Sequence, residues 1–93
     1  MNINLQTLIF TRSDKPNNYV NEKVGKLVQQ YPDTSRVDVT LKEGAKNNLN
    51  NKWCELYLSL RGDNKFAKKN SASYEESILK AVAAMEKTLR RLH

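Results

Sequence analysis

The segment WCELYLSLR, residues 53–61, has the strictest alternation of apolar with other residues in the chain. Its alternating apolar positions are Cys54, Leu56, Leu58 and Leu60. Successive side chains of a β-strand point to opposite faces, so this period of two predicts a strand with one buried face. We expect the apolar side chains to face the core, and Trp53 and Tyr57 to lie on the wetter face of the sheet.

Three further segments have the character of strands. The middle one alternates polar residues with Val37, Val39 and Leu41. Together the patterns predict strands over residues 2–9, 36–43 and 65–70. Residues 62–64, Gly-Asp-Asn, form the expected turn before the last strand, and the Asn-rich residues 44–51 form the expected mobile hairpin loop.

Two segments repeat their apolar residues every three or four positions, as an amphipathic α-helix does. The first helix is expected over residues 16–31, after capping residues and a proline in residues 11–16. The second is expected from 74 to about 92, after a capping box in residues 73–76. The apolar positions are Val20, Val24, Leu27, Val28 and Tyr31 in the first helix, and Tyr74, Ile78, Val82, Met85, Leu89 and Leu92 in the second.

The resulting order, β-α-β-β-β-α, predicts an α+β fold with a four-stranded sheet. Each helix has one apolar stripe, so both helices are expected to pack on one face of that sheet. The chain has 93 residues. A second domain would have too few residues for its own core, so we expect residues 1–93 to form a single domain.

Composition excludes several classes of protein. No apolar run reaches the roughly 20 residues of a membrane span, and the N-terminus has no signal-peptide pattern. We therefore expect a cytoplasmic protein with no membrane partner. The only cysteine is Cys54 and the only histidine is His93, which argues against a disulfide framework, a Cys/His metal site and a His-based nucleophile. We expect no catalytic residue, no metal, no cofactor and no small-molecule substrate.

Charge is the main functional signal. Sixteen Lys and Arg stand against ten Asp and Glu, which gives a net charge of +6 and a pI near 9.6. Residues 61–93 carry eight of the basic and four of the acidic residues, so the excess is concentrated there. A positive surface attracts polyanions, nucleic acid first, although a charge of this size also serves solubility.

Helical spacing places the basic residues in one row on each helix. The row on the first helix, on a flank of its apolar stripe, contains Tyr19, Lys23, Lys26 and Gln30. The row on the second helix, nearly opposite its stripe and beside two alanines, contains Lys80, Lys87 and Arg91. Rows on neighbouring helices form a surface suited to structured RNA, whose recognition depends on shape and phosphates. The plain alternative is that the lysines are simply solvated and that Arg90 and Arg91 offset the helix dipole.

Other candidates have equally good structural explanations. Lys65, Lys68 and Lys69 either hold phosphates or protect an edge strand from aggregation. Trp53 and Tyr57 either stack on bases or pack across strands. Cys54 is more simply a small buried residue than a reactive thiol.

In addition, the chain resembles the ribosome hibernation promoting factors, also called ribosome-associated inhibitor A or sigma-54 modulation proteins. The resemblance covers essentially all of the sequence. It rests on the order and spacing of MNINL at 1–5, YVNEKVGKL at 19–27, VDVTLK at 37–42, FAKK at 66–69, SYEESI at 73–78 and KTLRR at 87–91. No one of these pieces is diagnostic by itself.

The resemblance implies a fold similar to a double-stranded-RNA-binding domain with an added first strand. It also implies a translation inhibitor that binds ribosomal RNA in the mRNA and tRNA cleft of the small subunit under stress or in stationary phase. The implied RNA-binding residues are Lys23, Lys26, Lys87 and Arg91, with Lys80 and Arg90 on the same surface.

The sequence departs from the family in three places. Ser73 stands where an aspartate is common, basic residues precede the second helix where acidic ones are common, and Gly25 replaces a better helix former. The sequence ends after the second helix, so we expect a short form without a C-terminal dimerisation domain. Two alternatives stay open: a general module for structured RNA, and a protein-interaction domain that modulates transcription.

Overall fold

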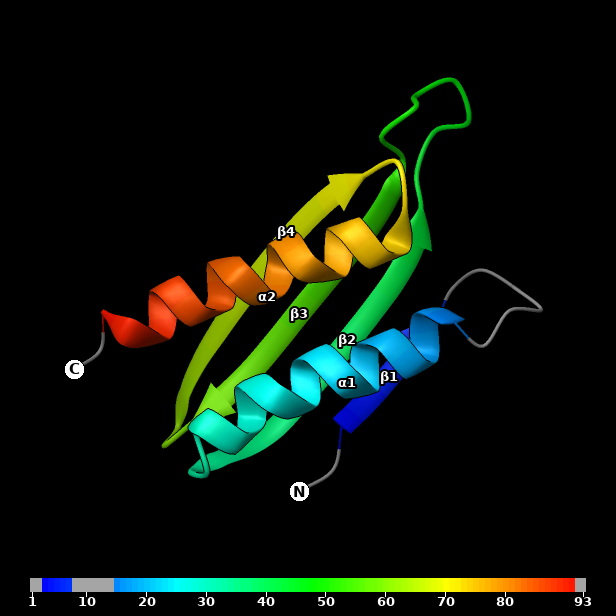
Figure 1. Cartoon of the computed structure of the whole chain (residues 1–93). Coiled ribbons are helices and arrows are strands. Elements are labelled where there is room, and N and C mark those ends of the chain that lie inside the picture. The colour runs from blue at the N-terminus through cyan, green and yellow to red at the C-terminus, as the bar shows by residue number, and fades with distance from the viewer. Residues whose placement is uncertain (1–2, 8–14, 92–93) are drawn as a thin grey trace.

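The computed structural model describes the backbone of residues 3–7 and 15–91, and the side chains of residues 19–91. Six elements follow one another along the chain (Figure 1). They are β1 (Ile3–Thr7), α1 (Lys15–Gln30), β2 (Thr34–Glu43), β3 (Lys52–Leu60), β4 (Asp63–Ser71) and α2 (Tyr74–Arg90). Some predicted features lie partly outside the described residues. They are the ends of the first strand (residues 2 and 8–9), most of the capping segment before the first helix (11–14) and the C-terminal residues 92–93.

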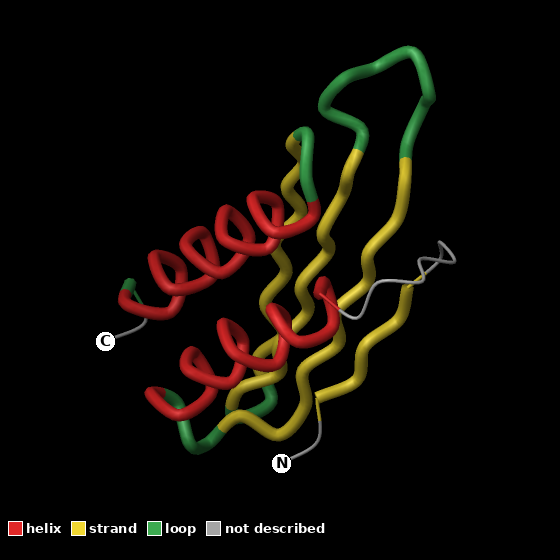
Figure 2. Tube along the Cα trace, turned by 45° about the vertical axis from the view of Figure 1, so that its right-hand side comes forward, coloured by secondary structure: helices red, strands yellow, loops and turns green. Residues whose placement is uncertain are grey.

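The strands form one sheet in the order β1-β2-β3-β4. β2, β3 and β4 are antiparallel neighbours, and β1 pairs in parallel with β2. Both helices lie side by side on one face of the sheet and run in the same direction, as Figures 1 and 2 show. The predicted α+β class, with two helices and three antiparallel strands, is confirmed.

The core lies between the sheet and the two helices. Leu56, in the middle of β3, stands opposite Val39 on β2 and Ala67 on β4, and all three are buried. The apolar stripes of the helices close the core from the other side, through residues such as Leu27 and Met85. Cys54, Leu56, Leu58 and Leu60 are buried, while Trp53 and Tyr57 are half-buried on the opposite face. The alternation in residues 53–61 therefore predicted both faces of β3 correctly.

The turn between β3 and β4 differs from the sequence prediction. The turn was expected at residues 62–64, but Leu60 pairs with Asp63, so the connection is the two-residue turn Arg61–Gly62. Both residues have positive φ, 53° and 84°, as a type I′ hairpin turn requires. Because β4 begins directly after this turn, it covers Asp63–Ser71 rather than residues 65–70.

The loop between β2 and β3 is closed by hydrogen bonds at its base and within it. The Gly44 N–H donates to the Asn51 carbonyl at 2.7 Å, and the Asn50 N–H donates to Asn48 Oδ1 at 2.9 Å. A Cβ at Gly44 would lie 2.9 Å from Trp53 Nε1. Glycine at this position thus lets the half-buried tryptophan pack against the base of the hairpin.

Candidate nucleic-acid interface

The position of α2 is set by its cap and its buried stripe. Ser73 has an extended backbone, and its Oγ accepts a hydrogen bond from the Glu76 N–H at 3.2 Å. The reciprocal half of the predicted capping box is not formed, because the Ser73 N–H donates to Ser71 Oγ at 3.3 Å and Glu76 pairs with Lys80 instead. Along the helix, the fully buried apolar positions are Ile78, Ala81, Met85 and Leu89, and Ser77 is buried beside them.

Replacing Ser73 by alanine is expected to lower the free energy of unfolding by about 1 kcal/mol, because the Glu76 N–H loses its acceptor. Ser73→Asp is the matched control, since aspartate caps a helix equally well and should leave stability within a few tenths of a kcal/mol. Urea unfolding followed by circular dichroism measures both variants. Equal stability of the alanine variant and the unmodified protein would contradict the capping role.

The four basic candidates on α2 differ in their partners. All four are exposed. Lys80 pairs with Glu76 at 3.5 Å, one turn earlier on the same helix. Within residues 19–91, Lys87, Arg90 and Arg91 form no ion pair. The C-terminal end of α2 thus presents three exposed cations with no acidic partner among residues 19–91.

The two candidates on α1 share one acidic neighbour that the sequence prediction overlooked. Lys23 Nζ lies 3.6 Å and Lys26 Nζ 4.0 Å from Glu22 Oε1. Lys23 is 29% exposed and its ammonium lies 5.5 Å from the centre of the Tyr19 ring, whereas Lys26 is 67% exposed. Glu22 therefore neutralises part of the positive charge of this row.

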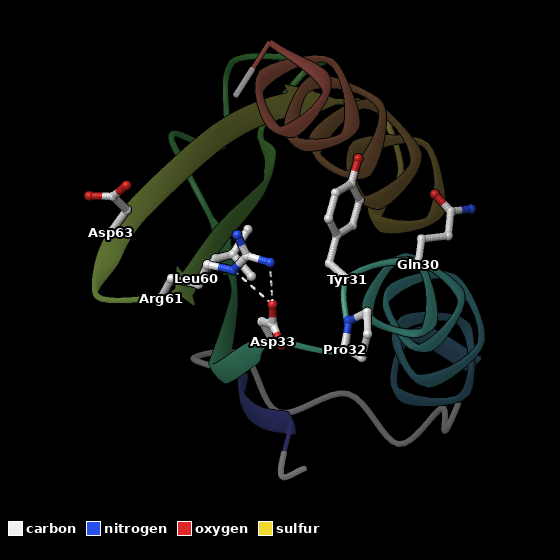
Figure 3. Close-up of a pocket in the computed structure, with 7 residues that line it drawn as sticks. All are labelled: Gln30, Tyr31, Pro32, Asp33, Leu60, Arg61 and Asp63. Carbon is white, nitrogen blue, oxygen red and sulfur yellow. Dashed lines mark hydrogen bonds and ion pairs between the residues drawn. The ribbon is translucent and has the colours of Figure 1, made fainter. Parts of the chain in front are cut away.

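The arrangement of the helices brings the C-terminal ends of the two rows to the same end of the molecule (Figure 1). α1 and α2 contact each other, and their C-terminal ends lie at the same end of the sheet (Figure 1). Gln30, the last residue of the α1 row, points from the end of α1 toward α2 (Figure 3). The C-terminal parts of the two helices, which carry Lys26 on α1 and Lys87, Arg90 and Arg91 on α2, therefore lie toward the same end of the sheet (Figure 1).

Two of the candidates outside the helices, Lys68 and Trp53, contact each other on the other face of the sheet. Lys68 Nζ lies 4.9 Å from the centre of the Trp53 ring and 3.6 Å from Glu55 Oε2. Lys42 also contacts Glu55, at 2.7 Å, and its hydrogen bond lowers the pKa of that carboxyl. Cation and carboxylate are thus paired on this face, which supports cross-strand packing for Trp53.

Cys54 is buried, and its burial raises the pKa of the thiol to about 12. A thiol that stays protonated at neutral pH is a poor nucleophile. In the described part of the chain, no group of three or more acidic, histidine or cysteine side chains is arranged to hold a metal ion. Neither described helix is long and apolar enough to cross a membrane.

A sequence model of the family described as "Sigma 54 modulation protein / S30EA ribosomal protein" matches residues 3–93. The chain belongs to this family. Sigma 54 modulation/S30EA proteins are ribosome-associated and are not enzymes. A comparison with curated proteins finds no match.

Solved structures support the same fold for this sigma 54 modulation/S30EA protein. A ribosomal subunit interface protein from Coxiella burnetii has a TM-score of 0.85 at 14% sequence identity, covering 99% of this chain and 97% of the other. The N-terminal domain of Protein Y from Thermus thermophilus has a TM-score of 0.79 at 23% identity, covering 100% of both chains. At these identities the likeness establishes the fold.

Proposed function

We propose that this protein is a ribosome hibernation factor that binds ribosomal RNA in the mRNA and tRNA cleft of the small subunit and blocks translation. It would act in the cytoplasm, under stress or in stationary phase. The family membership and the two basic helix rows support the proposal. The observation that carries it is the group of three exposed cations at the end of α2, Lys87, Arg90 and Arg91, which have no acidic partner in residues 19–91.

The mechanism is steric exclusion held by phosphate contacts. Arginine guanidinium groups and lysine ammonium groups bind phosphate oxygens by charge-assisted hydrogen bonds. Ala83 is exposed and Ala84 half-buried beside the α2 row, so small side chains leave room for an RNA backbone to approach the helix. No bond is made or broken, and the occupied cleft excludes mRNA and tRNA.

Binding to the small subunit is expected to depend strongly on salt. If four to six phosphates are neutralised, the logarithm of the affinity falls with the logarithm of salt concentration with a slope of roughly −4 to −5. Fluorescence anisotropy of labelled protein with isolated small subunits measures this slope. A slope near zero would contradict an RNA interface and favour a protein partner.

Glu22→Gln is expected to tighten this binding by about two- to fivefold, because a charge at 4 Å is worth up to about 1 kcal/mol in water. The change releases Lys23 and Lys26 from their acidic neighbour without altering the length of the side chain. Glu43→Gln is the matched control, since Glu43 pairs with Lys52 between β2 and β3 rather than with a basic residue of either helix row. Unchanged or weaker binding of the Glu22 variant would exclude the α1 row from the interface.

A general RNA-binding module is the second candidate, favoured by the same unpaired cations. Competition separates the two: an unrelated RNA duplex displaces a general binder from small subunits, whereas it leaves a hibernation factor bound.

The match to the Protein Y domain covers both chains fully, and on this ground we propose that residues 1–93 act as one ribosome-binding domain.

A further inference from the structure

A pocket of about 320 Å³ lies at the end of the molecule where α1 ends and the β3–β4 turn begins. This volume is at the lower end of the range of small-molecule sites, roughly 300–1,000 Å³, and suits a small planar group. The residues that line it come from two distant segments of the chain: Gln30, Tyr31, Pro32 and Asp33 from the first, and Leu60, Arg61 and Asp63 from the second. Neither the packing of the core nor the RNA contacts proposed for the basic rows requires an open pocket at this place.

One wall of the pocket offers a flat apolar surface. Tyr31 is half-buried and packs against the core, with Pro32 following it. In Figure 3 the Tyr31 ring stands on one side of the pocket and Leu60 and Arg61 on the other, with Asp33 between them at the lower rim. An aromatic ring held in this way is a stacking surface for a base.

Asp33 at the rim and Arg61 on the wall opposite Tyr31 offer an acceptor beside a donor (Figure 3). The Nε and Nη2 atoms of Arg61 lie 2.7 and 2.6 Å from Oδ2 of Asp33. Oδ1 of Asp33 has no hydrogen bond or ion pair with the described part of the chain. The guanidinium and the free carboxylate oxygen therefore present a donor and an acceptor side by side. Guanine presents the complementary edge, since its O6 acceptor adjoins the N1–H and N2–H donors.

The backbone at Arg61 supports a role beyond the turn itself. Its φ of 53° lies in the left-handed region, where a type I′ turn favours asparagine, aspartate or glycine. Arginine at this position makes the turn less stable than asparagine, aspartate or glycine would. Its side chain is the one that reaches across to Asp33.

The pocket is continuous with the proposed RNA surface. Gln30 is both the last residue of the α1 row and part of the pocket lining. An RNA strand held along that row would therefore bring an unpaired base to the pocket mouth.

We propose that this pocket binds a guanine base, stacked on Tyr31 and hydrogen-bonded along its edge by Asp33 and Arg61. The base comes from unpaired RNA or from a free guanine nucleotide. The RNA source rests on the proposed function, whereas the site itself is testable without ribosomes.

The test is an NMR titration of the ¹⁵N-labelled full chain. The probes are GMP, AMP, CMP and UMP, and the single-stranded RNAs UUGUU and UUAUU. GMP or UUGUU is expected to shift the amide signals of Tyr31, Asp33, Arg61 and Gly62, with affinity on the order of tenfold above that of the adenine probes. Shifts with GMP alone identify a free nucleotide as the source, and shifts with UUGUU identify RNA.

Arg61→Asn separates binding from folding. Asparagine before Gly62 is the preferred type I′ pair, so thermal stability should be kept or raised while guanine affinity falls on the order of tenfold or more. Lys46→Ala, in the loop at the other end of the sheet, removes one positive charge and should change neither (Figure 1). The proposal is overturned if millimolar GMP and UUGUU leave these signals unmoved, if all four bases shift them equally, or if Arg61→Asn binds guanine unchanged. Each of these results leaves the small-subunit proposal standing.

Discussion

Replacing Lys87 and Arg91 together by glutamate is expected to weaken binding to the small ribosomal subunit by at least about a hundredfold at 0.1 M salt. Each change removes a phosphate contact and places a negative charge opposite the RNA backbone. The salt slope should also fall in magnitude by about 2, one for each lost contact. Both side chains are exposed, so the variant should melt at nearly the same temperature as the unmodified protein.

The matched control for this variant is Lys46→Glu with Arg36→Glu. These side chains are also exposed, and the pair of changes gives the same net charge, but they lie on the β2–β3 loop and on β2. Only a modest, long-range loss of affinity is expected from the control. If the helix variant binds as tightly as the control, the RNA surface is not the one formed by α1 and α2.

Leu56→Ala should produce the largest change in stability. Leu56 is 1% exposed and lies between Val39 and Ala67 at the centre of the sheet. Removing its side chain leaves a cavity that costs about 2–5 kcal/mol of the free energy of unfolding. For a chain of this length, that loss lowers the melting temperature by roughly 10–30 °C.

Leu49→Ala is the control for the same chemical change, because Leu49 is 89% exposed on the loop between β2 and β3. Its effect on stability should stay within about 0.5 kcal/mol. Calorimetry of the two variants compares them directly. Similar melting temperatures would mean that the apolar face of β3 is not the centre of the core.

Most of the architecture could be predicted from periodicity alone. A period of two in residues 53–61 and a period of three to four in both helices identify the faces that are buried, because burial selects apolar residues at every such position. The basic residues were placed correctly on exposed or half-exposed helix positions by the same reasoning. The ion pair of Glu22 with Lys26 could also have been predicted from the sequence, since an acidic residue four positions before a lysine is a known helix pairing.

What could not be predicted depends on contacts between distant segments. Gly62 is followed by Asp63 and Asn64, all good turn formers, so local composition did not distinguish a turn at 61–62 from one at 62–64. The pairing of Leu60 with Asp63 decides it, and that register follows from burying Ala67 and Ser71. The pocket joins Tyr31 and Asp33 to Arg61, almost thirty residues later, through the folded sheet.

Co-sedimentation of the purified protein with isolated small and large ribosomal subunits tests the central claim most directly. The series should span low to high salt and include mRNA and tRNA as competitors. A hibernation factor of the kind proposed pellets with the small subunit alone, is released by salt, and is displaced by both competitors. Equal binding to both subunits, or binding that mRNA and tRNA do not displace, would contradict occupation of the small-subunit cleft.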